Sequence, residues 1–159
     1  MKRVLSTVLP LGGILVLVVA VSAWASASGQ GSGNSGSGKT LTVIEHATTD
    51  KTTDTGASGD SVGDILTFAN DVFDATDAAK VGTDNGYCLR TVKGAAYECN
   101  WTVLLAGGQI TVEGPFLDAA NSTLAITGGT GRYRGARGSM ALQSREKGAK
   151  FAFAFHITG

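Results

Sequence analysis

Apolar and polar residues alternate through most of the chain after residue 38, and a two-residue period is typical of a β-strand with one buried face. The first such stretch is residues 40–47, in which Leu41, Val43 and Glu45 fall on one face. A glutamate in line with two apolar residues is unusual. Thr42, Ile44 and His46 fall on the other face.

The second stretch, residues 64–74, contains β-branched and aromatic residues, which favour a strand over the helix that its length also permits. Leu66, Phe68, Asn70 and Val72 share one face, and Asn70 is the polar member of an otherwise apolar row. The residues between these two strands, 48–63, are rich in Gly, Thr and Asp and are predicted to be a loop.

Residues 81–105 contain two β-type runs on either side of Lys93-Gly94, together with the only two cysteines. A two-residue turn at Lys93-Gly94 makes Cys88 and Cys99 face each other, as it does for the pairs Arg90 with Tyr97 and Gly86 with Trp101. Facing residues on antiparallel strands are close enough for a disulfide.

The turn also sets which kind of pair the cysteines form. A two-residue turn makes Cys88 and Cys99 a pair whose backbones are hydrogen-bonded to each other, and such a pair suits a disulfide less well. A longer loop or a bulge would make them a pair without mutual backbone hydrogen bonds. An even number of cysteines in an exported chain favours one disulfide, and two reduced thiols are the alternative.

Four further strands complete the predicted fold. Each is short, alternates in polarity and is bounded by glycine or another turn residue. Ala106-Gly107-Gly108 is predicted to be a second tight turn, after the one at Lys93-Gly94. The first of the four ends at Gly114-Pro115. Eight short strands without a long helix predict an all-β domain, an eight-stranded antiparallel β-barrel or a sandwich. The four strands are residues 109–113, 122–127, 139–145 and 150–157.

The N-terminal part of the 159-residue chain has a different character. Residues 1–25 have a basic start, an apolar run and small residues at cleavage spacing, which predicts a secretory signal peptide and a secreted protein. An uncleaved membrane anchor is the alternative, because the apolar run approaches the length that spans a bilayer. Residues 26–38 are a Gly/Ser linker, and residues 39–159 form the predicted domain.

Charge and histidine content narrow the function. Removal of Lys2 and Arg3 leaves 11 basic and 13 acidic residues, a net charge of 11 − 13 = −2, so nothing favours nucleic-acid binding. His46 and His156 are the only histidines and have no neighbouring ligand at metal spacing. We predict neither a metal site nor a cofactor.

Several segments resemble one family. GDILTFANDVFD, VGTDNGYC, ITVEGPFL, LAITGGTGRYRGARGSMALQ and the closing FAFAFHITG are similar to the allene oxide cyclase family, and more weakly to dirigent proteins. The resemblance implies an eight-stranded antiparallel barrel, commonly a homotrimer. It also implies an apolar cavity in which plant members cyclise an unsaturated fatty-acid epoxide, largely by positioning the chain.

The resemblance assigns roles to three residues. Asn70 matches an asparagine that holds a water, Cys88 matches a cavity cysteine, and Glu45 matches a glutamate that supports charge development. Three positions depart from the plant pattern: Ala47 stands where a second asparagine is expected, Phe116 replaces a tyrosine, and Cys99 stands where plant members have a small residue. A Cys88–Cys99 bridge makes the cavity cysteine structural.

We therefore expect a secreted barrel that binds a small apolar or phenolic molecule and guides a cyclisation or isomerisation, with Glu45 and Asn70 as catalytic groups. The alternative is a non-catalytic binding or structural barrel, in which Glu45 pairs with Arg90 or Arg145. We expect Asn70→Leu to abolish turnover without changing thermal melting. The predicted ligand-contacting residues are Phe68, Cys88, Tyr97, Trp101 and Phe116.

Overall fold

A computed structural model of the chain describes residues 38–159. The predicted signal peptide and nearly all of the predicted linker lie outside the described residues. Within residues 38–159, no helix is long and apolar enough to cross a membrane.

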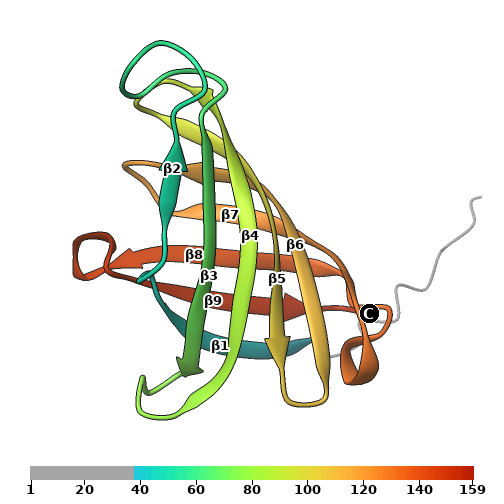
Figure 1. The fold of residues 1–159 in the computed structure, drawn as a ribbon. Helices are drawn as coiled ribbons and strands as arrows, with labels where there is room; N and C mark the ends of the chain where they lie inside the picture. Colours follow the sequence, from blue (N-terminus) through green and yellow to red (C-terminus); the bar gives the residue numbers. More distant parts are fainter. Residues whose placement is uncertain (1–37) are drawn as a thin grey trace, which may run out of the picture. The chain divides into compact units, whose positions relative to one another are not determined.

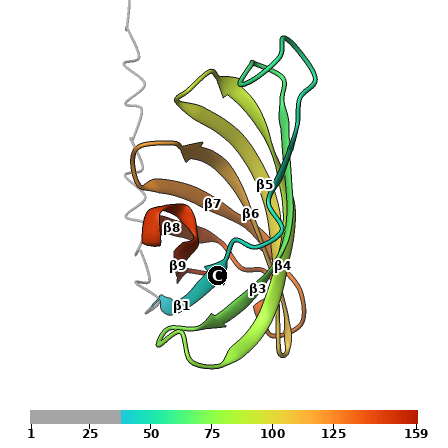
Figure 2. The same cartoon turned by 60° about the vertical axis from the view of Figure 1, so that its left-hand side comes forward.

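The domain is a closed eight-stranded antiparallel β-barrel (Figures 1 and 2), as the sequence predicts. Neighbouring strands follow the order β1-β9-β8-β7-β6-β5-β4-β3, and pairing of β1 with β3 closes the barrel. A ninth strand, β2, adds only to the outer edge of β3. The strands are β1 (Lys39–His46), β2 (Lys51–Thr53), β3 (Ile65–Asp74), β4 (Lys80–Val92), β5 (Ala96–Leu105), β6 (Gly108–Leu117), β7 (Ser122–Gly129), β8 (Gly138–Arg145) and β9 (Lys150–Ile157).

The faces predicted from the alternation are the faces that the barrel buries. On β9, Phe151, Phe153, Phe155 and Ile157 belong to the core, and the intervening His156 is exposed. Alternate residues of β1 and of β3 to β8 complete this core. Each strand therefore supplies one row of side chains to the lumen, as expected of a small barrel.

Two predicted boundaries were wrong. Residues 51–53, predicted as loop, form β2, because they run alongside the start of β3 and pair with residues 65–67. The strand predicted to end at Gly114-Pro115 continues to Leu117, and Pro115 lies opposite Glu98 of β5. Proline is tolerated there because β6 pairs with β7 only up to Glu113, so no ladder bond is lost on that side.

The β4–β5 hairpin has the predicted register with a different turn. Arg90 faces Tyr97 and Cys88 faces Cys99, but Val92 pairs with Ala96, which leaves a three-residue turn and a bulge between positions 90 and 92. Both backbone polar groups of Arg90 bond toward β3, to Asp64 and Gly63. The backbones of Arg90 and Tyr97 are therefore not hydrogen-bonded to each other. The same holds for Cys88 and Cys99, because pairs two residues apart on antiparallel strands are of the same kind.

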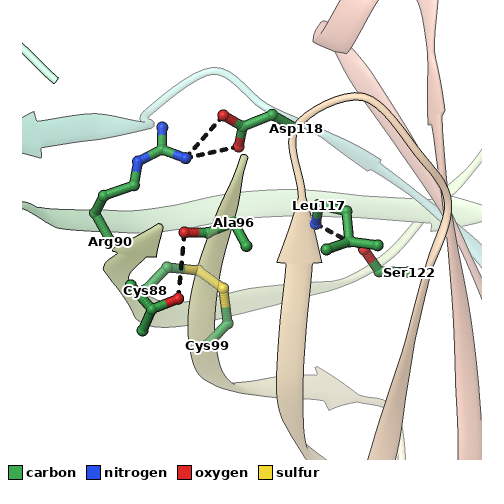
Figure 3. The surroundings of a disulfide bond; sticks show 8 residues. Cys88, Arg90, Ala96, Cys99, Leu117, Asp118 and Ser122 are labelled. Carbon is green, nitrogen blue, oxygen red and sulfur yellow. Dashed lines mark hydrogen bonds and ion pairs between the residues drawn. A yellow bond between two sulfur atoms is a disulfide. The ribbon is translucent and has the colours of Figure 1, made fainter. Parts of the chain in front are cut away.

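The bulge thus gives the disulfide its favourable setting. Figure 3 shows the Cys88–Cys99 bond crossing between the two strands, with a Cα–Cα distance of 4.0 Å. The prediction of a disulfide is confirmed, and among the described residues there are no free cysteines. Cys88 and Cys99 are both buried, so the bond is part of the barrel wall.

We predict that the double substitution Cys88→Ala, Cys99→Ala lowers the free energy of unfolding by about 2–3 kcal/mol, because the unfolded chain loses a short closed loop. Urea titration followed by tryptophan fluorescence measures the loss. The unaltered protein in excess dithiothreitol should match the double variant. Equal stability of oxidised protein and double variant would contradict the prediction.

Arg90 organises the end of the barrel beside this hairpin. Its Nη1 donates to both carboxylate oxygens of Asp118 at 2.8 Å (Figure 3), and its Nε lies 2.7 Å from Asp60 Oδ1 at an angle too poor for a hydrogen bond. The guanidinium lies 3.6 Å from the ring centre of Tyr97, a cation–π contact. Arg90 therefore ties the loop before β3 and the turn after β6 to the barrel.

Candidate functional site

An apolar cavity with one polar end lies inside the barrel. Its walls carry five aromatic rings and three further apolar side chains, and its polar end is formed by Glu45 and Asp50. The space is about 350 Å³ with its open mouth included. The wall residues are Leu66, Phe68, Cys88, Trp101, Phe116, Leu142, Phe151 and Phe153.

The wall residues of the cavity differ in burial. Trp101 and Phe153 are buried, whereas Leu66, Phe68 and Phe116 are only partly buried and therefore border the opening. Trp101 lies close to the backbone of β4 because its partner there is Gly86. A Cβ at that glycine would collide with the Cβ of Trp101, so only glycine permits this close approach.

Asn70 is the central hydrogen-bonding residue at the polar end. Its Nδ2 donates to Glu45 Oε1 and to Asp50 Oδ1, each at 2.7 Å. Its Oδ1 accepts the backbone N–H groups of Thr48 at 3.0 Å and Thr49 at 2.9 Å, and the Thr49 hydroxyl. One amide thus joins the inward glutamate of β1 to the loop that follows it.

A second buried acid, Asp84, lies opposite Asn70 on β4. Its Oδ1 accepts the backbone N–H of Asn70 at 3.3 Å, and its Oδ2 has no hydrogen-bond donor among the described residues. The charge of Glu45 acts on Asp84, so the two carboxyl groups are neighbours in this buried part of the barrel. Two ionised carboxylates that are close and buried repel each other, which favours a proton on at least one of them.

Burial is the main reason why both groups hold protons tightly. It raises the pKa of Glu45 to about 7, with a further upward effect from the charge of Asp50 and an opposing effect from the Asn70 amide. Burial, and then the charge of Glu45, raises the pKa of Asp84 to about 9. Near neutral pH, the pair of Glu45 and Asp84 therefore still holds a proton, the property expected of a proton-transferring site.

The structure brings most of the predicted site residues together. Glu45 forms the polar end, and Phe68, Cys88, Trp101 and Phe116 line the walls. Asn70 contacts Glu45 directly, but its bonds are structural as well. The predicted pairing of Glu45 with Arg90 does not occur, because Arg90 pairs with Asp60 and Asp118.

Tyr97 does not line this cavity. Its ring lies beneath Arg90 and borders a separate, open hollow near the loop before β3. Its inward side contacts the core through Phe116, at a ring-centre distance of 6.4 Å.

Asp50 and Asp84 were missed by the sequence analysis. The position of Asp84 could have been inferred from the sequence. It is four residues from Cys88 on the same strand and therefore faces the same side, and Cys88 was predicted to lie in the cavity. Asp50 had none, because it lies in the loop after β1 and reaches Asn70 only through the path of that loop. Among residues 38–159, no group of three or more possible metal ligands is arranged around one ion position.

The family follows from a match over most of the barrel. The sequence model of the family described as "Allene oxide cyclase barrel like domain" matches residues 43–155, which is well over half of the chain. The chain belongs to this family. The allene oxide cyclase-like match begins in β1 and ends in β9, so it includes every residue of the cavity.

Solved structures with a similar fold belong to proteins whose names describe different reactions. Pyocyanin demethylase is 28% identical to this allene oxide cyclase-like chain, with a TM-score of 0.64, and the match covers 76% of this chain and all of that one. AbnU, an exo-specific intermolecular Diels-Alderase, is 19% identical, with a TM-score of 0.63 and coverages of 78% and 100%. The pterocarpan synthase dirigent protein PsPTS1 is 16% identical, with a TM-score of 0.58 and coverages of 77% and 97%. The last two likenesses show a shared fold alone.

Proposed function

We propose that this barrel binds a small, largely apolar molecule in the Glu45 cavity and guides its cyclisation or isomerisation, with Glu45 exchanging a proton with the ligand. The observation that carries the proposal is a buried carboxyl group, hydrogen-bonded to Asn70, at the end of an aromatic cavity. The fold supports it, because structures that share this fold belong to a demethylase, a Diels-Alderase and a dirigent protein.

The residues divide the task between positioning and proton transfer. The aromatic walls restrict the orientations of a bound molecule, and such restriction alone lowers the barrier to ring closure. Asn70 fixes the Glu45 carboxyl by donating to it, and the second buried acid, Asp84, favours a proton on one of the two carboxyl groups. Glu45 then accepts or returns a proton at the polar end of the ligand.

Trp101 offers a further polar contact. Its Nε1–H is buried and has no acceptor among the described residues, although a buried indole N–H usually has one. The ring lines the cavity. A ligand with a carbonyl or ring-nitrogen acceptor supplies the missing partner, which favours a polar-substituted ring system over a pure hydrocarbon.

The accessible space sets a condition on binding. The closed part of the cavity has room for only a few water molecules. A ring-sized ligand therefore enters by displacing the partly buried side chains at the mouth. Phe68 and Phe116 are the rings that border it.

The test is to incubate the purified protein with a phenolic and lipid extract of the producing cells and to record native mass spectra. We expect one retained small molecule per barrel, which is then identified and offered as substrate. The unaltered protein should convert it, and Glu45→Gln, which keeps an acceptor for Asn70 but cannot take up a proton, should bind it with at least a hundredfold slower conversion.

A pair of tryptophan substitutions locates the binding. Leu66→Trp narrows the mouth and should abolish retention, whereas Leu89→Trp, on the exposed face of the neighbouring strand, should leave it unchanged. Retention without conversion by the unaltered protein supports the alternative, a binding barrel without catalysis. Retention by the Leu66→Trp variant, or no retention at all, overturns the proposal.

Export and assembly belong to the same proposal. A disulfide persists in oxidising compartments, which supports a secreted protein. The resemblance to allene oxide cyclases supports a homotrimer, and the native spectra report the mass of the assembly directly. A purely monomeric spectrum at micromolar concentration would exclude the trimer.

A further inference from the structure

We infer that the cavity selects ring systems that carry a positive charge or a hydrogen-bond donor, and that it rejects carboxylates. This inference rests on the proposed function, because it names the chemical class of ligand for the same site. A cavity of this selectivity would differ from one that binds the carboxylate of a fatty acid at its polar end. The reasons lie in the charges and the walls of the cavity.

The first reason is that the polar end contains only acids. Glu45 and Asp50 line it, and Asp84 is a buried neighbour of Glu45. Among residues 38–159, the groups that hydrogen-bond to these three acids are neutral: the side-chain amide and the backbone N–H of Asn70. Neither Glu45 nor Asp50 forms an ion pair with a Lys, Arg or His in residues 38–159, although six such pairs occur elsewhere in the domain.

The second reason is that the elements packed against these acids bring no compensating charge. Glu45 faces Val72 of β3 and Phe151 of β9, and Asp84 faces Val103 of β5. The nearest arginine on β4, Arg90, is already paired at the other end of the hairpin. An anion in the cavity would therefore meet carboxylates in a partly desolvated space, where like charges repel strongly.

The third reason is the aromatic wall. Phe68 and Phe153 flank Trp101, at ring-centre distances of 5.9 and 5.6 Å, and Phe116 and Phe151 form a further edge-to-face pair at 5.7 Å. Aromatic faces attract cations, and a cation enclosed by aromatic rings with carboxylates nearby is a recurrent mode of recognition for quaternary nitrogen. The unpartnered Trp101 N–H adds a polar contact for an acceptor elsewhere on the same ring system.

Three probes of nearly equal shape separate charge from size. N-methylquinolinium is a cation, 1-methylnaphthalene is its neutral isostere, and 1-naphthoate replaces the methyl group by a carboxylate. Isothermal titration at pH 8 should rank the affinities in that order, with at least a tenfold step from the cation to the neutral probe and no detectable binding of the anion. Because the three probes have the same two-ring area, a difference in their affinities reports the difference in their charge.

Variants of the two lining acids identify the source of the selectivity. Asp50→Asn and Glu45→Gln each keep an oxygen acceptor for Asn70 while removing a charge, so each should weaken cation binding about tenfold and leave the neutral probe unchanged. Glu98→Gln, on the exposed face of β5, is the matched control and should change neither. Circular dichroism melts check that each variant is folded.

The pH dependence gives a second readout. Affinity for the cation should rise between pH 6 and 8 as Glu45 loses its proton, and Glu45→Gln should flatten this rise. Equal or tighter binding of the neutral probe or the anion overturns the inference and leaves the proposed function standing. Failure of all three probes to bind overturns both, and equal weakening by Glu98→Gln would show that the cation binds only the acidic surface.

Discussion

Replacing Asn70 by leucine is expected to lower the free energy of unfolding by about 3–5 kcal/mol, because several buried groups lose their partner and each one costs about 1–3 kcal/mol. The amide satisfies two acids and two backbone N–H groups at once. Leucine fills the same space but leaves Glu45 without a donor and the start of the loop after β1 without an acceptor. Urea titration measures the effect.

This expectation corrects the one drawn from sequence, in which Asn70→Leu left melting unchanged. Phe68→Leu, two residues earlier on the same face, is the matched control and should cost much less, since Phe68 is only partly buried. Asn70→Asp keeps the acceptor for Thr48 and Thr49 but brings another acid beside Glu45, so it should also destabilise at neutral pH. A loss below about 1 kcal/mol for leucine would show that water replaces the amide.

The barrel was predictable because it depends on repeated local signals. Every strand that closes it shows a two-residue period, and register follows wherever one face is buried. The β4–β5 register was correct even though the turn was not, because the bulge near Arg90 compensates for the additional turn residue. The short strand β2 was not predictable, since Lys51–Thr53 is exposed and has no apolar face to show a period.

The site was predictable only in part, for a related reason. Glu45 and Asn70 interrupt apolar rows, and an interruption of that kind is visible in sequence. Asp84 also lies on an inward row, but the small residues Gly82 and Gly86 beside it make that row hard to recognise as apolar. Asp50 reaches the site through a loop whose path depends on tertiary contacts. Local patterns thus indicate which strand residues face inward, but not which loops cover them.

Stability should fall as the pH rises from about 5 to 9, because the fold raises the pKa values of both Glu45 and Asp84. The unfolded chain releases these protons near pH 4, whereas the folded barrel holds them until about pH 7 and 9, so the stabilisation is complete below pH 4 and is lost across the higher range. For Glu45 alone, the rise from 4.5 to about 7 corresponds to about 3 kcal/mol at about 1.4 kcal/mol per unit.

Asp84→Asn tests this directly, since asparagine keeps an acceptor for the Asn70 backbone N–H and does not titrate. The variant should match the unaltered protein near pH 5 and exceed it in stability at pH 9, while the pKa of Glu45 stays raised because its main cause, burial, is unchanged. Asp64 and Asp74, whose pKa values are lowered by backbone N–H groups of Thr55 and Ala78, act in the opposite direction and only on the acid side. Melting curves between pH 5 and 9 therefore report on the buried pair, and a flat profile for the unaltered protein would show that burial does not raise the pKa values of Glu45 and Asp84.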